Sequence, residues 1–172
     1  MWRDVLTFLE SVSFDDLLIP GWVDRTTSPP TYRPSDFDVY LRADTGLLEF
    51  SSVASRGGLR IRLTEAIVHA DDPDDEWGAL SVGGHYLPPS DSARCTGMRL
   101  FTNDQSVPED GVFRAAEMTF ADTYRVFIDP FWGDGIRLSS GATPDSWLAE
   151  QRSPDHEGIF GSLREFSWEA PG

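Results

Sequence analysis

Apolar residues near the N-terminus recur three and four residues apart, at Trp2, Val5, Leu6 and Leu9. Because an α-helix has 3.6 residues per turn, these side chains share one stripe. We therefore expect an N-terminal helix that ends near Ser13.

The following segment, up to residue 36, is rich in residues that interrupt regular structure. Residues 14–19 predict a further short turn, because Pro20-Gly21 follows them directly. Pro29, Pro30 and Pro34 predict an extended, irregular connection. We therefore expect the helix and this extended segment to make up residues 1–36.

From residue 37 the pattern alternates between apolar and polar positions, which is typical of a strand with one buried face. Residues 37–42 and 47–54, with a turn at 43–46, predict a hairpin. Gly57-Gly58 then turns the chain into a strictly alternating strand at 59–64. Residues 37–69 therefore predict a three-stranded antiparallel meander.

The second half begins with an irregular, acidic loop region at 70–96, interrupted by one short strand at 79–82. Further strands are predicted at 98–102, 112–120, 124–129, 136–138 and 163–169. Thr143-Pro144-Asp145 is typical of a helix start, and Pro154 should end that helix, which we place at 144–152.

These elements predict an α+β fold in one domain, residues 1–172, with β-hairpins, the short helix and a final strand in residues 97–172. We expect mainly antiparallel sheet, about six to eight strands, with an N-terminal helix and a short C-terminal helix.

Charge narrows the classes of partner. The chain has 14 positive side chains, all arginine, against 29 acids, and its net charge is -15. Such a surface repels nucleic acid and anionic membranes, because proteins that bind either of them gain most of their affinity from their own Lys and Arg side chains. The acids are uneven: residues 71–93 hold six and no arginine. Acidity that serves only solubility remains an alternative explanation.

The N-terminus has no secretory signal pattern, and no apolar stretch has the length of a membrane span. The only cysteine, Cys95, excludes an intramolecular disulfide. We therefore expect a cytoplasmic protein.

Catalytic and metal-binding motifs are absent from the sequence, so we predict no enzyme activity and no catalytic residue. Three histidines, at 69, 85 and 156, could gather around zinc with Cys95, but none lie at the usual ligand spacing. The acidic run has Pro73 and Glu76 where a calcium-binding EF-hand loop needs a ligand and a glycine. We therefore predict no metal and no cofactor.

Two loops combine tryptophan with acids, which favours docking of a basic protein. The first holds five acids in six residues directly before an aromatic residue: Asp71, Asp72, Asp74, Asp75, Glu76 and Trp77. The second is the tip of a predicted hairpin and contains Phe131, Trp132 and Asp134. These nine residues are the candidate partner-binding site.

The strand–turn–strand segment 124–140, followed by Pro144-Asp145-Ser146-Trp147, resembles the small acidic bacterial immunity proteins of polymorphic or contact-dependent toxin systems. The resemblance implies a tight complex with a basic, nuclease-like toxin domain whose active site is blocked, and it assigns no role to single residues. The alternative is a β-rich protein, a small-molecule binder or enzyme, with a pocket inside a curved sheet.

Overall fold

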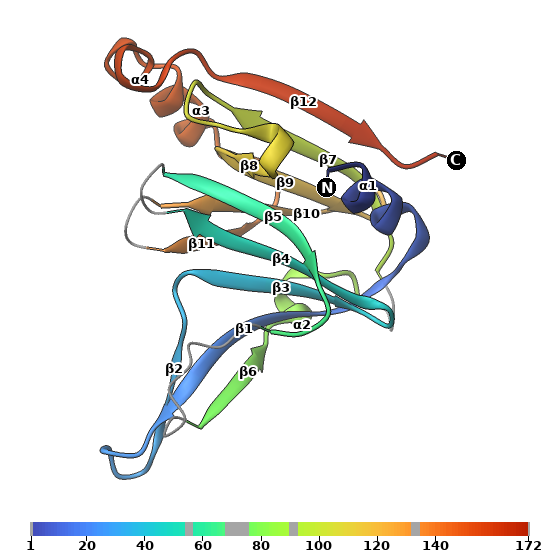
Figure 1. Ribbon diagram of the computed structural model, residues 1–172, viewed down its shortest axis with the longest axis vertical. Helices are drawn as coiled ribbons and strands as arrows, with labels where there is room; N and C mark the ends of the chain where they lie inside the picture. The colour runs from blue at the N-terminus through green and yellow to red at the C-terminus, as the bar shows by residue number, and fades with distance from the viewer. Residues whose placement is uncertain (1, 54–56, 68–75, 90–92, 132–134, 172) are drawn as a thin grey trace.

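The computed structural model describes residues 2–53, 57–67, 76–89, 93–131 and 135–171, which fold into two antiparallel sheets and four α-helices (Figure 1). The α+β class is confirmed. The described residues contain twelve strands, more than the six to eight predicted. The helices are α1 Trp2–Ser11, α2 Gly83–Tyr86, α3 Asp145–Gln151 and α4 Pro154–Phe160, with a 3₁₀ helix at Pro108–Asp110.

The first sheet has seven strands: β1 Phe14–Asp24, β2 Thr31–Pro34, β3 Asp38–Ala43, β4 Gly46–Val53, β5 Gly58–Thr64, β6 Trp77–Ser81 and β8 Val112–Phe113. Their order is β2-β1-β3-β4-β5-β8, and β6 pairs with β1. The second sheet has the order β11-β10-β9-β7-β12 and consists of β7 Cys95–Thr102, β9 Ala115–Phe120, β10 Tyr124–Pro130, β11 Ile136–Ser140 and β12 Arg164–Glu169.

The prediction for residues 14–34 was wrong, because β1 runs straight through Pro20-Gly21. Residues 14–18 of β1 pair with β3 and residues 21–24 pair with β2, so Pro20 lies in the gap between the two partners. A proline there costs no ladder bond, and its carbonyl still accepts a bond from Ser35 N at 2.6 Å. The expected irregular connection likewise contains a strand, β2.

The single strand predicted at 112–120 is divided at Arg114 between the two sheets. The Arg114 side chain is buried, and its guanidinium contacts Asp129 Oδ1 at 3.0 Å and Gln151 Oε1 at 2.9 Å. This residue therefore ties the crossover between the sheets to β10 and to α3.

The C-terminal helical region also differs from the prediction. Pro154 begins α4 instead of only ending the helix before it, and Ser153 Oγ caps the new helix by accepting from His156 N at 3.3 Å. Thr143 does not cap α3, because its hydroxyl donates to buried Glu117 at 2.7 Å.

One apolar cluster joins the two sheets. Leu48, Phe50 and Ile61 from the first sheet pack with Met118 and Ile128 from the second, all essentially inaccessible to solvent. Leu9 of α1 belongs to the same cluster. In β1 this core cluster contains Leu17, and Ile19 packs against it, whereas residues 22–24 at the distal end of the strand are only partly buried.

Candidate partner-binding arm

The distal half of β1 leaves the body of the protein together with β2 and β6. This three-stranded projection, residues 19–34 and 76–81, is here called the arm, and it extends from the lower end of the molecule in Figure 1. Every side chain of β2 and β6 is exposed or only half-buried, and Leu80 is 46% exposed. The arm thus offers both of its faces to solvent.

One face of the arm carries a tryptophan pair. Trp77, predicted as a partner-binding residue, lies opposite Trp22 in the β1–β6 ladder. Their ring centroids are 6.0 Å apart, and the two ring planes are inclined at 54°. In the ladder between β1 and β2, Arg33 lies opposite Trp22. The sequence reasoning missed Trp22, because only the long-range pairing of β1 with β6 brings the two rings together.

The other face is organised by Tyr32, which lies across two paired glycines, Gly21 and Gly78. The Tyr32 hydroxyl lies 2.9 Å from the carbonyl oxygen of Ile19 and 3.3 Å from that of Gly78. A Cβ on Gly21 would overlap the carbonyl oxygen of Arg33, whereas a Cβ on Gly78 would meet Tyr32 at an ordinary 3.8 Å. Partial burial raises the pKa of Tyr32.

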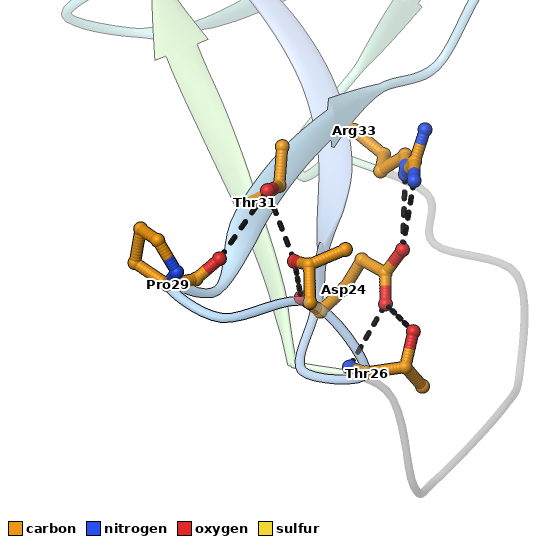
Figure 2. Close-up of polar contacts among 6 residues, drawn as sticks. Asp24, Thr26, Pro29, Thr31 and Arg33 are labelled. Atoms are coloured by element: carbon orange, nitrogen blue, oxygen red, sulfur yellow. Dashed lines mark hydrogen bonds and ion pairs between the residues drawn. The ribbon is translucent and has the colours of Figure 1, made fainter.

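The tip of the arm is held by side-chain hydrogen bonds (Figure 2). The Asp24 carboxylate accepts from Thr26 N at 3.0 Å and from Arg33 Nε and Nη2 at 3.1 and 3.0 Å. Bonds from Thr26 and then from Arg33 lower the pKa of Asp24. Thr31 Oγ1 lies 3.5 Å from the carbonyl oxygen of Pro29. These bonds preorganise the turn although little of it is buried.

Of the acids in the first predicted patch, the structure describes Glu76, which lies at the start of the arm's residues 76–81. This residue forms an exposed ion pair with Arg25, and its carbonyl oxygen accepts from Val23 N at 2.9 Å. The other predicted acids, Asp71, Asp72, Asp74 and Asp75, lie outside the described residues. The structure therefore places two of the six residues of this patch, Glu76 and Trp77, at the side of the arm.

The second predicted patch is represented by Phe131, which follows β10 and is 43% exposed. The guanidinium carbon of Arg137 lies 4.9 Å from the centre of its ring. Trp132 and Asp134 fall outside the part of the chain that the structure describes. Ile136 N donates to Asp36 O, and Ser35 N donates to Pro20 O. Residues 35 and 36 therefore connect the start of β11 to the base of the arm.

A groove of about 700 Å³ lies on the face of the second sheet that points away from the core. Its charged lining consists of Arg94, Arg99, Arg125, Glu117, Asp122 and Glu169. Arg99 is engaged by Glu117 at 3.3 Å and by Glu165 at 2.7 Å. Sequence reasoning missed this groove, because its residues come from three stretches of the chain, 94–99, 117–125 and 167–171.

The candidate metal ligands are not brought together within the described ranges, where no group of three His, Cys, Asp or Glu side chains has a metal-binding arrangement. His69 lies outside those ranges. Cys95 is buried, and burial raises its pKa to about 12. A thiol with so high a pKa stays protonated and is a poor ligand or nucleophile.

Among the residues placed by the structure, no helix has the length and apolar character needed to cross a bilayer. Comparisons of the chain with protein-family models, curated proteins and solved structures find no match.

Proposed function

We propose that the protein is an acidic protein-binding module of the bacterial immunity type, which acts in the cytoplasm and neutralises a basic, nuclease-like toxin domain by occluding its active site. In this proposal the arm is the docking surface, and the protein is not an enzyme.

The observation that carries the proposal is the arm itself. Ordering a strand segment costs about 1–2 kcal/mol per residue in backbone entropy, and burial in a core usually offsets that cost. The side chains of β2 and β6 are not buried, yet the arm is held by the Asp24 and Tyr32 hydrogen bonds. A rigid projection is suited to enter the concave active site of another protein.

Charge supports a basic partner. Nucleases bind the phosphate backbone through positive side chains, so an inhibitor with a net charge of -15 is complementary to their active-site surface. Exposed Trp and Tyr side chains often anchor such interfaces. The arm contributes Trp22, Trp77 and Tyr32, each only partly buried.

The experiment is co-expression with the basic C-terminal domain of a secreted protein encoded beside the gene for this chain. We expect the chain to rescue growth, to form a 1:1 complex and to abolish nuclease activity. A neighbouring toxin domain that stays active and unbound would contradict the proposal.

The outer groove favours a second candidate, the binding of a small polar molecule. Its volume lies in the usual range for ligand sites, and its charged lining holds three arginines and three acids, with Arg99 already paired to Glu117 and Glu165. A panel of small carboxylates, phosphates and amines tests this candidate by thermal shift. Stabilisation that Arg125→Gln abolishes would support it, and an unmoved melting temperature across the panel would contradict it.

A further inference from the structure

We infer that the free edge of β6 is a strand-addition site, which pairs with an extended basic segment of the partner protein. The inference rests on the proposed function and specifies how the arm would engage the partner.

The edge strands of the two sheets differ in how they are protected. Natural edge strands usually carry charges or proline, which prevent pairing with other chains. β2 contains Arg33 and Pro34, β11 contains Arg137, and β12 contains Arg164 and two glutamates. The remaining edge strand of the first sheet, β8, has two residues, and both are buried.

β6 has none of these protections. Its sequence is Trp-Gly-Ala-Leu-Ser, without charge or proline, and its last three residues are exposed. Among the described residues it pairs only with β1. An exposed, uncharged edge of this kind is a template for another strand.

The pairing with β1 determines which backbone groups face outward. Hydrogen bonds flank the ladder at both ends, Val23 N to Glu76 O at 2.9 Å and Val82 N to Leu17 O at 2.8 Å. Because bonding alternates along an antiparallel pair, Gly78 and Leu80 bond to β1. Ala79 and Ser81 therefore turn their N–H and C=O groups toward the open edge.

Charge identifies the occupant as a basic strand. Glu76, which forms an ion pair with Arg25, directly precedes β6, and in the sequence residues 71–76 hold five acids. A partner strand in which Lys or Arg alternates with apolar residues would complement this acidic stretch of sequence and would meet exposed Leu80. A second copy of this chain is disfavoured, because its own net charge of -15 would oppose the contact.

The probe is a short synthetic peptide of alternating lysine and valine, and amide hydrogen exchange is followed by NMR. We expect the peptide to slow exchange at Ala79 and Ser81, with Gly78 and Leu80 as internal references that are already bonded. The same peptide N-methylated at alternate residues keeps its charge but cannot pair. It should bind at least about tenfold more weakly, because at least two hydrogen bonds are lost.

Two variants at one position complete the test. Ala79→Pro removes the outward N–H and should abolish peptide binding, whereas Ala79→Val keeps the N–H and should bind normally. Equal binding of both peptides would overturn the inference, as would an absence of binding or protection elsewhere on the surface. A dimer formed without peptide that protects the same amides would also overturn it, by making a second copy the occupant.

The same exchange measurement on the complex with the basic toxin domain separates the two proposals. A complex that leaves Ala79 and Ser81 unprotected would overturn strand addition and leave the proposed function standing.

Discussion

Arg114 illustrates how one residue fixes the relation between the two sheets. Its guanidinium contacts Asp129 at 3.0 Å, and both side chains are almost inaccessible to solvent. Arg114→Met should lower the free energy of unfolding by about 2 kcal/mol, because buried Gln151 loses its donor and buried Asp129 loses one arginine while keeping its ion pair with Arg137. Urea denaturation measures this loss. The control is Arg164→Met, at an exposed pair with Asp104, which should change stability by less than about 1 kcal/mol. Equal effects would contradict this role of Arg114.

His156 gives α4 a dependence on pH. Burial, together with the charge of Arg114, lowers the pKa of His156 below its ordinary value of 6.5. As pH falls through that value the unfolded chain takes up the proton first, so stability should fall with pH. When the pH is lowered from about 7.5 to about 5.5, the free energy of unfolding should fall less for His156→Gln than for the native protein. Urea denaturation at several pH values measures this difference. Identical pH dependence in both proteins would exclude His156 as the cause.

At the level of elements, the arm depends on the packing of Tyr32 across two glycines. Gly21→Ala should disturb the pairing of β1 with β2, because the new Cβ would overlap a backbone carbonyl oxygen. Gly78→Ala is the matched control, because its Cβ would lie 3.8 Å from Tyr32. Hydrogen exchange should show lost protection in β2 and β6 for Gly21→Ala only, with the core unaffected. Loss of protection throughout the protein, or in both variants, would contradict a locally held arm.

The sequence predicted most elements with a clear period, including the β3–β4 hairpin, β5 and β10. It failed where long-range pairing overrides local signals: Pro20 is tolerated within β1 because of its position between β3 and β2. The division at Arg114 was equally hidden, because no local signal marks a change of sheet. For the candidate site, the sequence indicated Glu76 and Trp77 but not Trp22 or Tyr32, whose roles depend on partners distant in the chain.

For the whole molecule, charge and shape support the same account. The acids before β6 should attract a basic partner from a distance, whereas Trp77 should hold it after contact. Exposed charges act mainly on the association rate and are screened within about 8–10 Å at physiological salt. The two groups of residues should therefore affect different rate constants.

Binding kinetics against the basic toxin domain, at low and high salt, test the central claim most directly. Changing Asp71, Asp72, Asp74 and Asp75 to Asn should slow association and flatten its salt dependence. Trp77→Ala should speed dissociation and weaken binding by about 2 kcal/mol. The matched control neutralises four exposed acids away from the arm: Glu109, Asp110, Asp155 and Glu157. We expect that control to change association far less. Unchanged rate constants in both the four-Asp variant and Trp77→Ala, or equal slowing by the control, would contradict the proposed docking.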